Sequence, residues 1–143
     1  MGKILLVSAS RAGETQKIAE LIAEGIRIAG HEAVLKKANE IKKEEDLNGY
    51  DGYVFGSATY HGEMISTMKQ LLFIAERADL QDKPGGSFGA YGWSGEAPGR
   101  IFETMKHIFN MKMVSDALML KASWIGGGPQ AAQAYGKNIV EMI

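Results

Sequence analysis

The sequence contains no cysteine, and this absence removes several classes of chemistry. Disulfide bonds, thiolate nucleophiles and cysteine-ligated metal clusters all require that side chain. The three histidines, His31, His61 and His107, are scattered along the chain, which disfavours a histidine-ligated metal site. The sequence therefore predicts neither a disulfide-stabilised fold nor a metal centre.

An excess of charge of one sign and a long apolar run are also missing. Sixteen Lys and Arg residues stand against 17 Asp and Glu, so the basic excess typical of nucleic-acid binders is absent. No apolar run approaches the length of a membrane span, and residues 1–7 lack the pattern of a signal peptide. We therefore expect a cytoplasmic protein that binds neither nucleic acid nor a membrane.

The apolar pattern predicts strands that alternate with helices. At 143 residues, without a linker, repeat or low-complexity segment, the chain is expected to form a single domain over residues 1–143. Short apolar runs predict strands at 3–7, 32–37, 52–56, 85–91 and 117–123. Helical spacing predicts helices at 14–29 and 65–78, a third from residue 99, and a last one beginning near Pro129. The third helix is expected to point Ile101, Phe102, Met105, Ile108 and Phe109 inward.

This order of elements predicts an α/β fold with a parallel sheet covered by helices on both faces. The charged segment 39–47 is interpreted as a solvated connection with room for a short helix. In such a sheet, ligands bind beyond the carboxyl ends of the strands, where the strand order reverses. Three loops of unusual composition leave predicted strand ends: SASRAGET (8–15), GSATYHGE (56–63) and YGWSGEAPG (91–99).

The first loop has the composition of a phosphate site at the start of a helix. Ser8, Ser10 and Thr15 supply hydroxyl groups, and Gly13 permits a tight turn where backbone N–H groups and the helix dipole attract an anion. Neither the GxxxxGK[ST] nor the GxGxxG pattern is present. An ordinary helix cap built from the same residue types is the alternative interpretation.

The other two loops carry aromatic residues among glycines. Tyr60 lies in the loop after the third strand, and Tyr91 and Trp93 lie in the loop after the fourth. A flat ligand held between the two loops would account for both, and packing of these rings on neighbouring loops is the alternative. His61 is open to two interpretations, a proton donor beside the ligand or an exposed loop histidine.

Together these motifs resemble the flavodoxin family over the whole chain. The pattern SxxGxT of residues 10–15, the segment T-[aromatic]-x-G after the third strand and the aromatic loop GAYGWSGE carry the resemblance. GAYGWSGE is most similar to the FMN domain of A-type flavoproteins, the flavo-diiron proteins, here expected to stand alone. The resemblance implies a flavodoxin-like three-layer α/β/α sandwich with a five-stranded parallel sheet in the order 2-1-3-4-5.

The resemblance also implies FMN as the cofactor and assigns its contacts to the three loops. The phosphate would lie against the first loop, and the second and third loops would flank the isoalloxazine ring. Tyr60 would lie against one face of the ring, and Trp93, in preference to Tyr91, against the other. The implied cofactor-binding residues are Ser8, Ser10, Arg11, Ala12, Gly13, Glu14, Thr15, Ser57, Ala58, Thr59, Tyr60, His61, Gly62, Ala90, Tyr91, Gly92, Trp93, Ser94, Gly95 and Glu96.

Two departures from the family pattern affect these expectations. Ala12 stands where many flavodoxins have Ser or Thr, which removes one hydroxyl from the phosphate loop. The chain is nearly neutral, whereas typical flavodoxins are strongly acidic, so electrostatic attraction of a basic redox partner is expected to be weaker.

The implied function is an electron carrier that cycles FMN between its oxidised, semiquinone and hydroquinone forms and exchanges electrons with redox proteins. A Gly62 backbone with positive φ would let the peptide between His61 and Gly62 turn towards the reduced flavin. The main alternative is an NAD(P)H-dependent quinone or flavin reductase of the same fold, and a cofactor-free interaction domain is a further one. A monomer or weak dimer is expected.

Overall fold

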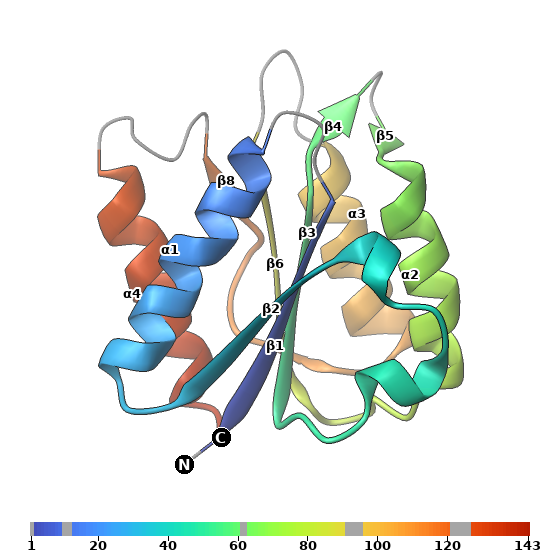
Figure 1. Cartoon of the computed structure of the whole chain (residues 1–143), viewed down its shortest axis with the longest axis horizontal. Coiled ribbons are helices and arrows are strands. Elements are labelled where there is room, and N and C mark those ends of the chain that lie inside the picture. Colours follow the sequence, from blue (N-terminus) through green and yellow to red (C-terminus); the bar gives the residue numbers. More distant parts are fainter. Residues whose placement is uncertain (1, 10–12, 61–62, 91–95, 121–126) are drawn as a thin grey trace.

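A parallel sheet runs through the middle of the molecule, with helices on both faces (Figure 1). The computed structural model describes residues 2–9, 13–60, 63–90, 96–120 and 127–143. The sheet strands are β1 (Lys3–Ala9), β2 (Glu32–Lys37), β3 (Gly52–Ser57), β6 (Pro84–Ala90), β7 (Lys112–Met113) and β8 (Leu118–Leu120). A small hairpin is formed by β4 (Thr59–Tyr60) and β5 (Glu63–Met64). The helices are α1 (Glu14–Ile28), α2 (Ser66–Arg77), α3 (Glu96–Glu103) and α4 (Gly128–Val140), with short helical turns η1 (Ala38–Glu40), η2 (Glu44–Leu47) and η3 (Thr104–Ile108).

The order of the strands confirms the predicted topology. The path across the sheet is β2-β1-β3-β6, and the position beyond β6 is shared by β7 and β8. β7 pairs with the start of β6 at Pro84 and Gly85, and β8 pairs with its end at Phe88 to Ala90. The expected fifth strand at 117–123 corresponds to β8, while β7 was not predicted because two residues carry no periodic signal.

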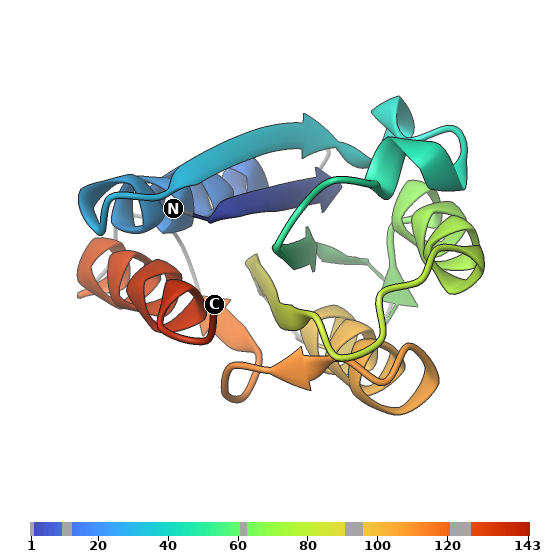
Figure 2. The ribbon, with the colours of Figure 1, turned by 90° about the horizontal axis from the view of Figure 1, so that it is seen from below.

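Two apolar layers fill the space between the sheet and the helices. Alternate side chains of β1 point to opposite faces, so Ile4 and Leu6 pack with α1 and α4, whereas Leu5 and Val7 pack with α2 and α3. Viewed from below, α1 and α4 lie on one side of the sheet and α2 and α3 on the other (Figure 2). Segment 39–47 forms η2 and most of η1, in agreement with the short helix that was predicted there. The buried side chain of Leu47 holds this segment against the core.

The third helix ends in a turn that the sequence pattern does not reveal. α3 runs into η3, a π-helical turn in which the N–H of Phe109 donates to the carbonyl of Thr104, five residues earlier. A π turn contains about one residue more than an α turn, which changes the side chains that face the core. Met105 and Phe109 are buried, whereas Ile108 points outward and is 57% exposed. The expectation that Ile108 points inward is therefore wrong, and Phe102 is half-buried.

A tyrosine from α4 completes the sheet where β7 and β8 leave a gap. The N–H of Val114 still donates to the carbonyl of Gly85, but residues 115–117 leave the edge of β6, and Ser115 and Asp116 are exposed. The backbone N–H of Ser87 donates instead to the hydroxyl of Tyr135, at 3.0 Å. Burial raises the pKa of Tyr135 to about 12. This side chain therefore supplies the hydrogen-bond acceptor that a continuous fifth strand would have provided.

Helices α1 and α4 approach each other closely at two glycines. A Cβ added at Gly25 of α1 would overlap the carbonyl oxygen of Gln133, and one added at Gly136 of α4 would overlap the carbonyl oxygen of Ile22. Because the missing side chains bring the two backbones together, the pair acts as one unit against the sheet.

Candidate functional site

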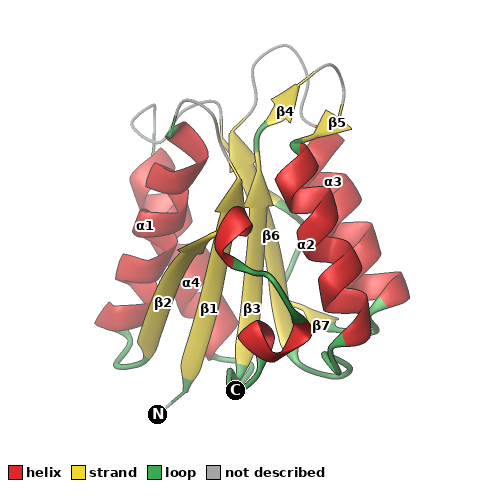
Figure 3. Ribbon diagram, turned by 45° about the vertical axis from the view of Figure 1, so that its right-hand side comes forward, coloured by secondary structure: helices red, strands yellow, loops and turns green. Residues whose placement is uncertain are grey.

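Three loops leave the sheet at one edge, from the carboxyl ends of β1, β3 and β6. The register sets Ala9 of β1 beside Ser57 of β3, and Gly56 of β3 beside Phe88 of β6. From β1 the chain passes to β2 on one side, and from β3 it passes to β6 on the other, so the strand order reverses at this edge. Figure 3 shows the three strand ends together. The described ends of the loops converge as predicted.

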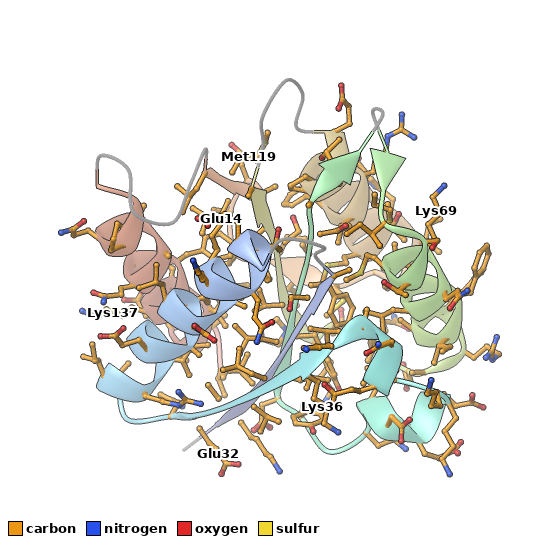
Figure 4. All side chains as sticks on the ribbon, turned by 45° about the horizontal axis from the view of Figure 1, so that its top comes forward. Glu14, Glu32, Lys36, Lys69, Met119 and Lys137 are labelled. Atoms are coloured by element: carbon orange, nitrogen blue, oxygen red, sulfur yellow. The ribbon has the colours of Figure 1, made fainter. Side chains whose placement is uncertain are left out.

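The first loop delivers the chain into the N-terminus of α1. Gly13 is the N-cap residue, with a φ of 82°, a left-handed conformation that glycine adopts without strain. Its carbonyl accepts the N–H of Lys17 at 3.1 Å. No side chain caps this helix end among the residues that the structure describes. Glu14 opens the first turn at the upper end of α1 (Figure 4).

Thr15 is the most informative residue of this first turn. Its side chain is completely buried, and its Oγ1 has no hydrogen-bond partner within the described parts of the chain. A buried hydroxyl without a partner is costly, so a native protein keeps one where a ligand or a local function uses it. Ser8 is also buried, near the carboxyl end of β1. The helix end thus combines a left-handed glycine with an unsatisfied hydroxyl.

The hydroxyls of the second loop are engaged in protein contacts. The Oγ of Ser57 donates to the carbonyl of Ala58 at 2.8 Å and accepts the N–H of Ile65 at 3.1 Å. The Oγ1 of Thr59 accepts the N–H of Ala97, in the first turn of α3, at 3.0 Å. These two side chains therefore fix the loop in place, and a direct cofactor contact by either stays a prediction.

The hairpin β4–β5 carries the second loop beyond the edge of the sheet. Tyr60 pairs with Glu63 in antiparallel register, and Thr59 pairs with Met64. The N–H of Ala58 donates to the carbonyl of Ala9 at 3.2 Å, so the base of the hairpin is bonded to the end of β1. The hairpin is thereby attached to both the first strand and α3.

The third loop starts from Ala90 and ends at Glu96, the first residue of α3. Ala90 is half-buried and pairs with Leu120 of β8. Glu96 is exposed and lines an open hollow of about 640 Å³ with Met64, Gly99, Arg100, Glu103 and Thr104. Half of the predicted contact residues lie outside the described parts of the chain: Ser10, Arg11, Ala12, His61, Gly62, Tyr91, Gly92, Trp93, Ser94 and Gly95.

The model of the flavodoxin domain matches residues 5–118, which include the three candidate loops. The chain belongs to the flavodoxin domain family. The predicted family and the predicted FMN cofactor of that family are therefore confirmed. An archaeal flavodoxin of known structure superimposes with a TM-score of 0.90 at 28% identity, over 97% of this chain and 96% of its own.

Two sequence relatives of this flavodoxin domain have different overall lengths. An NAD(P)H dehydrogenase (quinone) of Archaeoglobus fulgidus is 30% identical over 68% of this chain and 64% of its own. A type A flavoprotein of Rhodobacter capsulatus is 26% identical over 98% of this chain and 33% of its own. The flavodoxin domain thus spans about two thirds of the first relative and one third of the second.

The structure adds two features to the site of this flavodoxin domain that sequence reasoning missed. Ala97 contributes a backbone N–H to the contact that joins the second and third loops. Gly127, with a φ of 76°, begins α4 in the same way that Gly13 begins α1. The helix itself was predicted to begin near Pro129, but its left-handed glycine was not, although the GGGP cluster at 126–129 was an available signal.

No helix in the part of the chain that the structure describes is long and apolar enough to cross a membrane. The same residues contain no group of three His, Asp or Glu side chains placed to hold a metal ion.

Proposed function

We propose that this flavodoxin domain is an electron carrier that holds FMN at the carboxyl edge of its sheet and exchanges electrons with redox proteins. The observation that carries the proposal is the N-terminus of α1, where Gly13 is left-handed and the buried Oγ1 of Thr15 is unsatisfied. Bound FMN supplies reversible electron transfer. Residues 1–143 are proposed to act as one domain, in the cytoplasm.

The residues of the first turn of α1 fit the phosphate group of FMN. A phosphate has acceptor oxygens for both backbone N–H groups and a threonine hydroxyl, and the positive end of the helix dipole favours its charge. Thr15 has the donor that this role needs, because its Oγ1 is committed to no other group in the described chain. The carboxylate of Glu14 would repel the phosphate, so we assign the contact at that position to its backbone.

The second and third loops would hold the flavin ring in a fixed orientation. Thr59 and Ser57 bond the hairpin to α3 and to Ile65, so the backbone from 57 to 60 is positioned before any ligand binds. A preformed loop loses little conformational entropy when it closes on a ring. Tyr60 and Trp93 are proposed to cover the ring faces and to exclude water from it.

A Thr15→Val variant tests the phosphate assignment. Valine has nearly the shape of threonine but no hydroxyl, so we expect the dissociation constant for FMN to rise about tenfold. Riboflavin, which has no phosphate, should bind both proteins equally. Fluorescence titration of the apoprotein with each flavin measures both constants.

Thr104→Val is the matched control for this experiment. The hydroxyl of Thr104 donates to the carbonyl of Arg100 on an exposed helix surface, so its loss should leave FMN binding unchanged. An equal loss of FMN and riboflavin affinity in Thr15→Val would show that Thr15 supports the fold and does not bind phosphate.

Steady-state kinetics distinguish the proposed carrier from the alternative, a reductase. The 30% identity to an NAD(P)H dehydrogenase (quinone) is the reason to test that alternative. We expect the purified protein to be yellow, to release FMN on heating and to pass electrons from dithionite to a one-electron acceptor. With NADPH and a quinone, its turnover should not exceed that of free FMN. Rapid NADPH-dependent quinone reduction would establish an enzyme, and a colourless protein that does not bind FMN would overturn both functions.

A further inference from the structure

An apolar groove of about 250 Å³ lies between α2 and η3, on the outer face of the molecule. It is separate from the α1 end of the cofactor site, although Met64 of the β4–β5 hairpin closes one end of it. Two large apolar side chains stand at its sides, with Phe73 of α2 68% exposed and Ile108 of η3 57% exposed. The lining residues are Met64, Lys69, Leu72, Phe73, Glu76, Thr104, Ile108 and Phe109.

The charged residues of this groove are arranged symmetrically about Phe73. Lys69 lies one turn before Phe73 on α2, and Glu76 lies one turn after it. All three line the groove, so they share one flank of the helix. Figure 4 shows Lys69 at the outer side of α2, beyond the body of the protein. The surface therefore has an aromatic centre with a positive charge at one end and a negative charge at the other.

We propose that this surface is a two-fold interface between two copies of this chain, with the α2 helices antiparallel and crossing at Phe73. In a two-fold contact the same patch meets itself, so opposite charges must stand on opposite sides of the centre. The rise of 1.5 Å per residue puts Lys69 about 6 Å before Phe73 and Glu76 about 4.5 Å after it. Antiparallel packing then brings Lys69 of each copy opposite Glu76 of the other, with an offset along the helix axis of about 1.5 Å, the rise of one residue.

The groove also fits the apolar part of this contact. Its volume of about 250 Å³ accommodates one aromatic ring, and each copy both offers Phe73 and presents a groove that can receive it. An interface with a small apolar centre and charges at its ends is typical of weakly associating proteins. We therefore expect a dissociation constant on the order of 10 to 100 µM for the dimer. This inference does not depend on electron transfer.

Sedimentation equilibrium of the FMN-loaded protein over a range of concentrations tests the proposed dimer. A monomer–dimer equilibrium is expected, and Phe73→Ser should weaken it about 100-fold. Ile28→Ser is the matched control, since Ile28 is 60% exposed on α1 and lies outside the groove. This variant should associate as the parent protein does.

Charge reversal tests the antiparallel arrangement directly. Lys69→Glu and Glu76→Lys should each weaken the dimer about tenfold, because each brings like charges together across the interface. The double variant, Lys69→Glu with Glu76→Lys, restores opposite charges in every pair and should return to within about threefold of the parent. An unchanged flavin absorbance spectrum verifies that each variant is folded.

Two results would overturn the proposal. One is a parent protein that stays monomeric up to about 1 mM, well above the expected dissociation constant. The other is a dimer that persists in Phe73→Ser, or whose charge-reversal losses add in the double variant instead of cancelling.

Discussion

A Gly136→Ala variant is expected to lose about 3 kcal/mol of unfolding free energy, because a methyl group at this position has no space. The new Cβ would overlap the carbonyl oxygen of Ile22 and would lie 3.1 Å from the backbone N of Ile26. Both obstacles are backbone atoms of α1, so they cannot rotate away as the end of a side chain could. The two helices must separate, and buried contacts along their interface are lost.

Urea unfolding measures this loss, and Gly99→Ala provides the control. Gly99 also lies within a helix, but a Cβ added there meets nothing within 4 Å. That substitution should gain up to about 1 kcal/mol from the lower backbone entropy of the unfolded chain. If both variants gained stability, the close approach of α1 and α4 would not exist in solution.

A Tyr135→Phe variant is expected to lose about 2 kcal/mol, although it removes a single oxygen atom. The N–H of Ser87 would remain buried in the middle of β6 without an acceptor. Ser87→Ala is the matched control at the same place. It keeps the backbone N–H bond and removes the Ser87 Oγ, which is buried and has no partner within the described chain. This control should therefore be neutral or slightly stabilising.

Alkaline pH provides a second measurement on the same tyrosine. Because burial raises the pKa of Tyr135 to about 12, the folded protein holds the phenolic proton more tightly than the unfolded chain does. The stability from neutral Tyr135 is complete below about pH 10 and falls as the pH rises towards 12, by on the order of 2 kcal/mol. Tyr135→Phe should show a smaller fall between pH 10 and 12. Tyr53, whose pKa burial also raises to about 12, contributes to the fall that remains in this variant.

The elements that the sequence predicted well are those with strong local patterns. β1 is an apolar run whose residues Ile4 to Val7 are completely buried, and the buried face of α1 follows helical spacing through Ile18, Ile22 and Ile26. Their predicted bounds differ from the observed ones by one or two residues. The alternation of five such units predicted a parallel sheet with helices on both faces, and the resemblance to flavodoxins supplied the order of its strands.

The features that the sequence did not predict are a local turn without a residue signature and contacts between distant segments. The π turn at η3 moved Ile108 to the surface, and no residue type marks such a turn. The gap between β7 and β8 is closed by Tyr135, 48 residues after Ser87, and no local pattern records that bond. Ser57 and Thr59 were assigned to the site by the resemblance to flavodoxins, and the partners of their hydroxyls became known only from the fold.

The small residues of β6 determine the spacing of the layers at the cofactor edge. Phe88 is the one large side chain between Pro84 and Ala90. A Cβ added at Gly86 would lie 2.9 Å from the ring of Tyr135 on the α4 side. One added at Gly89 would overlap the carbonyl oxygen of Ser57 in β3 and would lie 2.7 Å from Pro98 on the α3 side. A larger residue at Gly86 would therefore push α4 outward, and one at Gly89 would force β6 away from both β3 and α3. The glycines of β6 thus set how closely α4 lies against one face of the sheet, and how closely β3 and α3 lie beside the strand end from which the third loop leaves.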